Sequence, residues 1–309
     1  MFIASFYKFV RLNRLEALRN TIVKTCIEHD VNGTILVAKE GINASMSAQG
    51  AEKLERCIEE VRLLLNLAEV HVNWSRSGST GIVFDRLQVR IRDEIVAFGA
   101  KFNFEKPEMI RADSETWTRM LEDPEFLILD VRNEYEFGLG NFVRSSSPKT
   151  HSFRQFSKWV ERNELELRKQ PVGIYCTGGI RCEKAAQFLG DRGIDNVTQL
   201  DGGILRYFES KPDSPLWRGE CFVFDKRVSL STDLTEGTAT QCHACRHPVT
   251  QEERNSTSYE EGISCPRCWS ELTEKRRSGL RERARQIKLA RGKNQYHVGT
   301  RAQRVQVEM

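Results

Sequence analysis

The chain has 309 residues, of which 39% are hydrophobic and 29% are charged. At about 150 residues per domain, this length predicts two domains or three small ones, and the ordinary composition excludes a collagenous, mucin-like or wholly disordered chain. No stretch approaches the length of about 18 apolar residues that indicates a membrane span. The first residues have neither a basic segment before their apolar part nor a small-residue cleavage site, so no signal peptide is expected.

The net charge of +4 is unevenly distributed along the chain. Residues 275–304 hold eleven Lys and Arg against one acid, Glu282, whereas the remaining residues hold 36 basic and 42 acidic side chains. An acidic body with a basic tail suggests a polyanionic partner. Nine cysteines are an odd number in a long chain without a secretory signal, which favours a reducing compartment, the cytoplasm, where cysteines serve metals or chemistry.

The first segment, residues 1–105, alternates strand-like and helix-like patterns. Apolar residues at helical spacing predict helices over 13–29 and 48–66. Strands are predicted for the runs FIASFYKFV, GTILVA, EVHVNWS and LQVRIRDEIVAFG. The order strand, helix, strand, helix, strand, strand is typical of a ferredoxin-like (acylphosphatase-like) α+β sandwich. Cys26 and Cys57 fall on apolar helix faces, which favours core packing for both.

Residues 113–215 predict a second domain, joined to the first by a charged, proline-containing linker at 105–112. A helix is predicted over 114–121, followed by the apolar strands FLILDV and PVGIYC. The second strand runs into TGGIRCEKAAQFLGDRG, a Gly-rich loop and a helix, and NVTQLDGG adds a short strand. Strands that alternate with helices indicate a parallel α/β sheet. Ligands of such sheets bind beyond the carboxyl ends of the strands, where Asp130 and Cys176 are placed.

The sharpest chemical signal is Cys176, which ends an apolar strand and opens a Gly-rich loop. The loop continues through Thr177, Gly178, Gly179 and Ile180, and Arg181 closes it. The backbone N–H groups of such a loop and the positive end of the following helix stabilise a thiolate and lower its pKa. Cys176 is therefore predicted as a nucleophile with Arg181 as a fixed positive charge beside it. The alternative is a buried structural cysteine at the end of a core strand.

A second group of cysteines lies in a Cys-rich module predicted over residues 216–274. Its members are Cys242, Cys245, Cys265 and Cys268, with the spacing C-x2-C-x19-C-x2-C. Two CxxC pairs offer four thiolates, the ligand set of a closed, tetrahedral structural zinc site. His243 and His247 are expected on the surface, although a histidine is able to replace a thiolate. The alternative is a metal-free cluster of reduced cysteines.

The last segment, 275–309, is predicted as a basic tail. The stretch RRSGLRERARQIKLARGK is compatible with a helix that carries positive charge on several faces. The residues expected to contact RNA phosphates are Arg276, Arg277, Arg281, Arg283, Arg285, Lys288, Arg291 and Lys293. Such contacts position an RNA without reading its sequence. The alternative is a solvated tail that aids solubility.

Weaker signals concern residues near these sites. Asp130 either supports the loop by accepting hydrogen bonds from its amides or from Arg132, or is a solvated strand end, with neither favoured. Cys182 is a candidate resolving thiol, although a structural role is favoured. A polar turn, which is more often an ordinary connection than an RNA-binding surface, contains Lys39, Glu40, Gly41 and Asn43. For Trp217-Arg218 and Phe222, core packing is favoured over stacking on a flipped base.

The residues around Cys176 resemble a rhodanese domain. The resemblance is carried by FLILDVRNEYEFGLGNF and VGIYCTGGIRCEKAAQFLGDRGIDNVTQLDGGILRYF. In rhodaneses a six-residue loop begins with the nucleophilic cysteine that carries a persulfide, and Cys176 occupies that position. Related phosphatase loops are one residue longer. Arg181 follows Cys176 by five positions rather than six, which disfavours a phosphatase.

The whole chain resembles a narrower family. Six segments carry this resemblance in order: VAKEGINAS, RLQVRIRDEIVAFG, CTGGIRCEKA, LDGGILRYFE, WRGECFVFDKRVSL and CHACRHPVT…SCPRCW. They are similar to the bacterial rhodanese-containing tRNA uridine(34) hydroxylases. The resemblance implies tRNA as partner, dioxygen as co-substrate and 5-hydroxyuridine at the wobble position as product. One departure is Gly140-Asn141 and the run Ser145-Ser146-Ser147, where rhodaneses often have Gly-His and Gly-Ala-Ile.

Three functions are compatible with these residues. The resemblance favours an oxygen-dependent tRNA hydroxylase, the cysteine loop alone favours a sulfurtransferase with a persulfide on Cys176, and the cysteine module with the basic tail allows a non-catalytic RNA-binding scaffold. The sequence shows no Gly-x-Gly-x-x-Gly fingerprint for flavin or nicotinamide and no evident two-His-one-carboxylate iron set. The residues by themselves support a reactive thiol, and hydroxylation rests on the resemblance. They leave the oligomeric state open.

Overall fold

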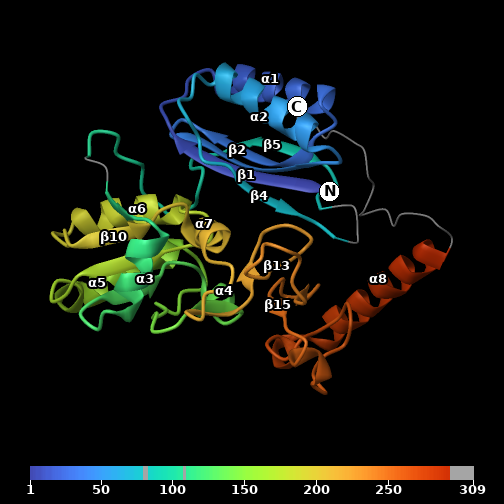
Figure 1. Cartoon of the computed structure of the whole chain (residues 1–309). Helices are drawn as coiled ribbons and strands as arrows, with labels where there is room; N and C mark the ends of the chain where they lie inside the picture. Colours follow the sequence, from blue (N-terminus) through green and yellow to red (C-terminus); the bar gives the residue numbers. More distant parts are fainter. Residues whose placement is uncertain (79–82, 107–108, 293–309) are drawn as a thin grey trace.

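The computed structural model describes residues 1–78, 83–106 and 109–292 (Figure 1). An N-terminal α+β domain packs on a central domain with a parallel sheet, and the Cys-rich module and a long helix follow (Figure 1). Among the described helices, none is long and apolar enough to cross a membrane. The mixed α/β and α+β fold class predicted from the sequence is confirmed.

The N-terminal domain is a five-stranded sheet covered on one face by two helices. Its elements are β1 (Phe2–Phe9), α1 (Leu15–Glu28), β2 (Asn32–Ala38), β3 (Gly41–Ala48), α2 (Ala51–Leu64), β4 (Asn73–Arg76) and β5 (Leu87–Ile91). The strand order is β4-β1-β3-β2-β5. The first four strands have the antiparallel pairing of the split-βαβ sandwich, and β5 adds a parallel partner to β2.

The predicted order omitted one strand, β3. Residues 41–48 follow the two-residue turn at Lys39 and Glu40 directly, and they pair with β1 over their whole length and with β2 over 41–47. The run GINASMSA nevertheless alternates core residues (Ile42, Ala44, Met46) with polar ones, which is the pattern of a half-buried strand, so the local signal was present although the prediction placed only a turn there. Gly41 has a φ of +143°, and a Cβ at that position would lie 2.0 Å from the carbonyl oxygen of Lys8. Glycine therefore permits the close approach of β1 at this turn.

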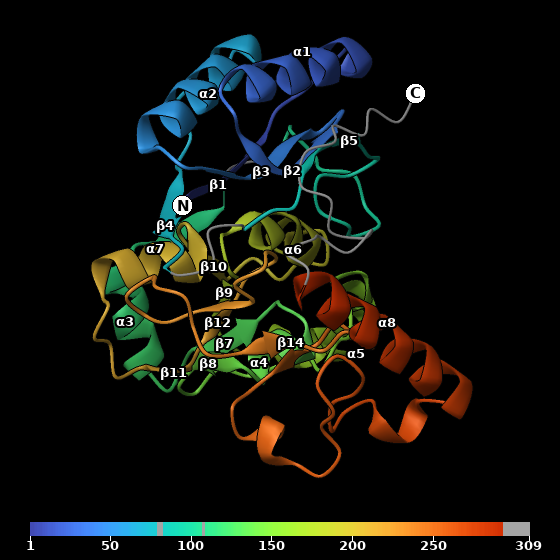
Figure 2. The ribbon, with the colours of Figure 1, turned by 90° about the vertical axis from the view of Figure 1, so that its right-hand side faces the viewer.

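Alternation along β1 gives the two faces of the N-terminal sheet different partners. Ala4 and Phe6 join the buried cluster beneath α1 and α2. Tyr7 and Phe9 point to the other face, where Tyr7 donates to Glu183 and Phe9 stacks on Phe102. That face of the sheet is turned toward the central domain (Figure 2). Because successive side chains of a strand point to opposite faces, one strand serves both a core and a domain interface.

The central domain has four parallel strands in the order β6-β10-β9-β7. Its elements are β6 (Ile110–Ala112), α3 (Ser114–Glu122), β7 (Leu127–Asp130), α4 (Glu134–Phe137), α5 (Arg154–Leu167), β9 (Val172–Tyr175), α6 (Ile180–Gly190), β10 (Val197–Leu200) and α7 (Gly203–Ser210). The parallel sheet is confirmed. The predicted linker at 105–112 is wrong at its end, because Ile110–Ala112 pairs with β10 as an edge strand.

Short strand pairs connect the central domain to the Cys-rich module. They are β8 (Gly140–Phe142) with β11 (Trp217–Gly219), β12 (Cys221–Phe222) with β13 (Ser229–Leu230), and β14 (Thr240–Gln241) with β15 (Pro248–Val249). The 3-10 turns η1 (Glu253–Asn255) and η2 (Trp269–Glu271) precede helix α8 (Glu274–Gly292). Trp217 and Phe222 are buried, which confirms core packing for both aromatic side chains.

A buried ion group fixes the N-terminal domain against the central domain. The ammonium of Lys184 on α6 lies 2.8 Å from Glu40 and 2.6 Å from Glu94. Glu40 also accepts a hydrogen bond from the backbone N–H of Ile95 at 2.9 Å, and Asn43 donates to the Ile95 carbonyl at 3.0 Å. Buried charges require such partners. Glu40 of the predicted polar turn therefore makes a domain contact, and Gly41 and Asn43 belong to strand β3 rather than to the turn.

Candidate active site

Cys176 directly follows β9 at the carboxyl end of the parallel sheet, and its side chain is fully buried. The backbone N–H of Gly179 donates to its sulfur at 3.1 Å. Gly179 has a φ of +94°, and a Cβ there would lie 2.8 Å from the Tyr7 hydroxyl. Glycine at 179 therefore allows the loop to turn its amide toward the sulfur and leaves room for Tyr7.

The segment after β10 supports the loop from a second direction. The N–H groups of Ile204 and Leu205 donate to the carbonyls of Cys176 and Thr177 at 3.0 and 3.1 Å. Gly203 lies so close that a Cβ would be 2.5 Å from the Cys176 carbonyl oxygen. This support, provided by the first turn of α7, was not predicted from the sequence. The glycine pair in LDGG was the only signal of it.

The surroundings of Cys176 favour its thiolate form. Burial by itself raises the pKa of the thiol. The hydrogen bond from Cys182, the charge of Arg181 and the backbone N–H groups of these two residues outweigh burial, and they lower the pKa of Cys176 to about 6. This agrees with the mechanism expected for a cysteine that opens a loop at a helix N-terminus.

Arg181 is held by a carboxylate that the sequence did not single out. Its guanidinium makes two parallel hydrogen bonds to Glu136, at 2.7 and 2.8 Å, and both side chains are buried. Burial raises the pKa of Glu136, but the charge and hydrogen bonds of Arg181 outweigh it and the pKa falls below its usual value. The bidentate pair fixes the direction of Arg181 beside the loop. Glu136 belongs to the Glu-Tyr-Glu segment that matches rhodaneses, which was the available signal.

Asp130 makes its strongest contacts with Arg132 rather than with the loop. Both side chains are fully buried, and the carboxylate accepts hydrogen bonds from Arg132 at distances from 2.6 to 3.0 Å. Arg132 also donates to the carbonyl of Gly140 at 2.6 Å. Asp130 therefore neutralises a buried arginine that ties β7 to β8. Of the two partners predicted for Asp130, the structure favours Arg132.

Cys182 lies on the first turn of α6 and is fully buried beside Cys176. Burial and the hydrogen bond to Cys176 raise the pKa of Cys182 well above its usual value. The two shifts have opposite directions, which favours a thiolate at Cys176 that accepts a hydrogen bond from the thiol of Cys182. The loop brings together Cys176, Arg181 and Cys182, as the sequence predicted.

The N-terminal domain also reaches the loop, which the sequence did not predict. The hydroxyl of Tyr7 donates to Glu183 on α6 at 3.0 Å, and Arg111 forms an ion pair with the same carboxylate at 2.8 Å. Burial, followed by the charges of Glu183 and Cys176, raises the pKa of Tyr7 well above its usual value. Residues separated by more than a hundred positions carry no local signal of such a contact.

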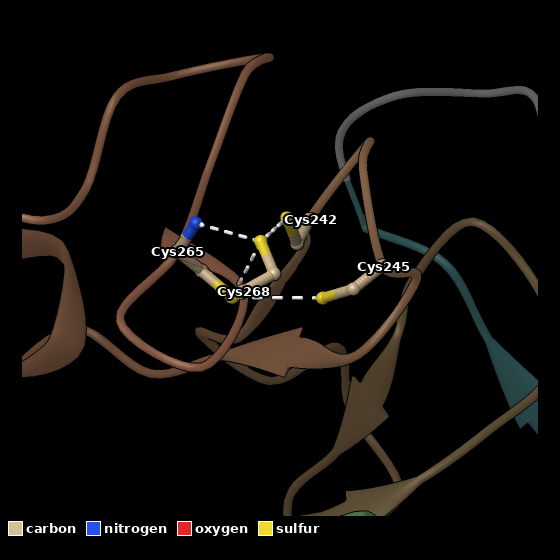
Figure 3. A group of neighbouring side chains, drawn as sticks. All are labelled: Cys242, Cys245, Cys265 and Cys268. Atoms are coloured by element: carbon tan, nitrogen blue, oxygen red, sulfur yellow. Dashed lines mark hydrogen bonds between the residues drawn. The ribbon is translucent and has the colours of Figure 1, made fainter. Parts of the chain in front are cut away.

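The four cysteines of the module converge on one point (Figure 3). Their sulfur atoms all lie within 4.8 Å of one another, with Cys242–Cys268 at 3.8 Å and Cys245–Cys265 at 3.6 Å. Four sulfurs at about 2.3 Å from a tetrahedral zinc ion are about 3.8 Å apart, so this geometry fits zinc. His243 is exposed and His247 stacks on Tyr135, and neither belongs to the cluster.

The predicted basic helix is present as α8, and it begins against the Cys-rich module. Leu280 packs on the cysteine cluster, and the helix projects away from the rest of the molecule (Figures 1 and 2). Arg276, Arg277, Arg281 and Arg285 are engaged by neighbouring carbonyls or carboxylates. Arg283 and Lys288 are exposed. The side chain of Arg291 and all of Lys293 lie outside the described residues.

Three family models match successive parts of the chain. The UPF0176 acylphosphatase-like domain matches residues 1–95, the rhodanese-like domain matches 114–210, and the rhodanase C-terminal region matches 218–277. The central match contains the whole cysteine loop, and the last match contains all four clustered cysteines.

Curated proteins match over almost the whole chain. A tRNA uridine(34) hydroxylase of Agrobacterium fabrum is 39% identical, over 96% of this chain and 94% of its own length. A protein of the same name from Mesorhizobium japonicum is 40% identical over 96% of both chains. A third, from Teredinibacter turnerae, is 37% identical over 97% of this chain and 93% of its own length.

Proposed function

The chain belongs to the tRNA uridine(34) hydroxylase family, and from that membership we propose that it hydroxylates uridine 34 of tRNA with Cys176 as the catalytic residue. The observation that carries the proposal is the thiolate of Cys176, held by the Gly179 amide and Arg181 at the carboxyl end of the sheet. A thiolate with a pKa near 6 is a nucleophile at neutral pH. The product expected from the family resemblance is 5-hydroxyuridine, with dioxygen as co-substrate.

The stoichiometry of this reaction gives Cys182 the role of electron donor in the proposal. Insertion of one oxygen atom of dioxygen into a C–H bond reduces the other atom to water, which consumes two electrons and two protons. Two thiols that become a disulfide release two electrons and two protons. Uridine, dioxygen and the two thiols thus give 5-hydroxyuridine, water and a disulfide, with all atoms and electrons accounted for. Cys182, beside Cys176, is the thiol placed to complete this exchange, and an external thiol reductant would restore the pair.

We further propose that Cys242, Cys245, Cys265 and Cys268 hold one structural zinc ion. The spacing of the sulfurs and the four-thiolate ligand set support this assignment. A site with four protein ligands has no open position for substrate. Zinc there would stabilise the module and the start of α8.

The proposed function of α8 is to bind the tRNA substrate. The exposed side chains of Arg283 and Lys288 would contact tRNA phosphates, while the anticodon loop presents its unpaired wobble base to the cysteine loop. A tRNA substrate also agrees with a cytoplasmic location, which the free cysteines led us to expect.

The proposal is tested by mass spectrometry of nucleosides from tRNA of cells that lack hydroxylated wobble uridine and express this chain. The wild-type protein is expected to add one oxygen atom to uridine 34, and Cys176→Ser to abolish it. Cys221→Ser is the matched control, because Cys221 is equally buried but burial raises its pKa to about 12. Unmodified tRNA with the wild-type chain, or full activity of Cys176→Ser, would contradict the proposal. Thiocyanate formation from thiosulfate and cyanide would instead indicate a sulfurtransferase.

A further inference from the structure

A cavity between the N-terminal and central domains lies next to the cysteine loop. Its volume is about 480 Å³, within the range of small-ligand sites. Strand β1 contributes Tyr7, Lys8 and Phe9, and the central domain contributes Gly178 and Glu183. Gly178 belongs to the loop that starts at Cys176, so one wall of the cavity is the loop itself.

The charges on the cavity wall disfavour a phosphate as its occupant. Three cationic side chains and three acidic ones line it: Lys8, Lys106, Arg111, Glu69, Glu183 and Asp201. Arg111 is already paired with Glu183 at 2.8 Å and lies 3.6 Å from Asp201, and Lys106 is paired with Asp191. Charges that neutralise one another give no net attraction for an anion. The wall nevertheless offers both donors and acceptors, which suits a neutral polar group.

The aromatic side chains of the wall favour a flat ring. Phe9 and Phe102 stack with their ring centroids 4.0 Å apart and an angle of 12° between the planes, and Phe104 meets Phe102 edge to face at 5.1 Å. All three line the cavity and are only partly buried. A nucleobase combines a flat π-face with donors and acceptors on its edge. Proteins bind unpaired bases by such stacking.

Tyr7 borders both this cavity and the cysteine loop, since it lines the cavity and a Cβ at Gly179 would lie 2.8 Å from its hydroxyl. Cys176 itself is fully buried and is not among the residues that line the cavity. A base in the cavity therefore lies beside the loop rather than on the sulfur. The cavity thus suits a neighbour of the nucleotide that is modified.

We propose that this cavity binds an unpaired base that flanks the target uridine in the RNA, stacked against the Phe9–Phe102 pair. The inference rests on the proposed function, which supplies the RNA substrate. The base in the cavity is a different one from the target uridine, and the residues that bind it are different from the catalytic cysteine. It predicts that substrate affinity depends on the N-terminal domain as well as on α8.

The test uses the full chain and an anticodon stem-loop RNA with 4-thiouridine at position 33, 34 or 35. Photocrosslinks from position 33 or 35 are expected in peptides that contain Phe9 or Phe102. Phe102→Ala is expected to weaken RNA binding roughly tenfold and to raise KM more than it lowers kcat, since stacking stabilises each bound base. Phe102→Tyr, which keeps the ring, is expected to restore the affinity. The matched control is Trp159→Ala, a partly buried ring stacked on Phe156 of α5 and outside the cavity wall.

The outcomes separate this inference from the proposed function. Hydroxylation by the wild-type chain with unchanged RNA affinity of Phe102→Ala would overturn the inference and leave the function intact. Crosslinks in the cavity from position 34 alone would also overturn it, because the cavity would then hold the target base. Absence of hydroxylation by the wild-type chain would overturn the function, whereas flanking crosslinks that Phe102→Ala removes would still support base binding in the cavity. Should Phe102→Ala fail to fold, the RNA affinity of Phe104→Ala and the crosslink positions in the wild-type chain test the inference instead.

Discussion

Two sites in this chain use the cysteine sulfur in different ways, one as a single thiolate and the other as a cluster of four. At the loop, one sulfur faces a backbone amide, an arginine and a single neighbouring thiol, and burial is outweighed by these donors. In the module, four sulfurs face one another within 4.8 Å, an arrangement that a divalent cation would stabilise. The comparison teaches that the partner of a thiolate, rather than its burial, determines its use. At Cys221, whose thiol donates to the carbonyl of Phe222, burial outweighs the charges of Arg132 and Arg181 and raises the pKa to about 12.

Removal of the metal should give the largest effect on stability, and it should unfold the cysteine module without unfolding the domain that holds the cysteine loop. Zinc content is expected near one ion per chain, and Cys265→Ser or a strong chelator should remove it. Structural zinc sites contribute roughly 10 kcal/mol of apparent binding free energy, so the module should lose its folded structure. Amide hydrogen exchange should then increase in residues 216–274, while β7 and β9 remain protected. Cys57→Ser is the control, since Cys57 lies beside Cys26 in the N-terminal core. Zinc-free protein of unchanged stability would show that the cluster needs no metal.

The pH dependence of kcat/KM should reveal the loop thiolate. The pKa of Cys176 is lowered from its ordinary value to about 6, so the thiolate is present above pH 6 and is lost as the pH falls through 6. Activity should decline about tenfold per pH unit below that point. The stability that the thiolate contributes is fully present only above the ordinary thiol pKa of 9.0, and it should be lost as the pH falls from there to about 6.

Arg181→Lys provides the sharper form of this measurement. The variant keeps a positive charge but loses the bidentate contact with Glu136, so the midpoint of the pH profile should move upward while the four-sulfur cluster keeps its zinc. Arg206→Lys, at a partly exposed pair with Asp201, is the matched control. A midpoint in Arg181→Lys that equals that of the wild-type chain would show that the guanidinium geometry does not set the pKa of Cys176.

The smallest expected effect concerns the helix that the module anchors. Replacement of both Arg283 and Lys288 by Ala should weaken tRNA binding a few-fold and reduce the slope of log affinity against log salt by roughly 1 to 2, because two fewer counterions are released. Lys24→Ala with Lys53→Ala on α1 and α2 is the control pair, exposed on the outer helices. An unchanged salt slope in the α8 variant would assign RNA binding to the folded domains and leave the cysteine module a purely structural unit.

The sequence by itself determined the two cysteine sites, because each site is specified by the spacing of residues that lie close together in the chain. A strand end followed by a Gly-rich turn specifies the loop, and two CxxC pairs specify the cluster. The parallel sheet and the basic helix were predictable for the same reason, since hydrophobic and charge periodicity are local properties. Strand β3 was predictable for that reason as well, because GINASMSA alternates the core residues Ile42, Ala44 and Met46 with polar ones, and the predicted element order missed this signal.

Only the tertiary structure decided which distant residues complete each site. Glu136 meets Arg181, Tyr7 meets Glu183, and Lys184 meets Glu40 across separations that no sequence pattern records. The same holds for the cavity between the domains, whose aromatic wall combines β1 with residues 102–104. The physical reason is that a buried charge requires a partner and a side chain requires a neighbour of matching shape. Neither requirement specifies where in the sequence that partner lies, and packing of the whole chain selects it.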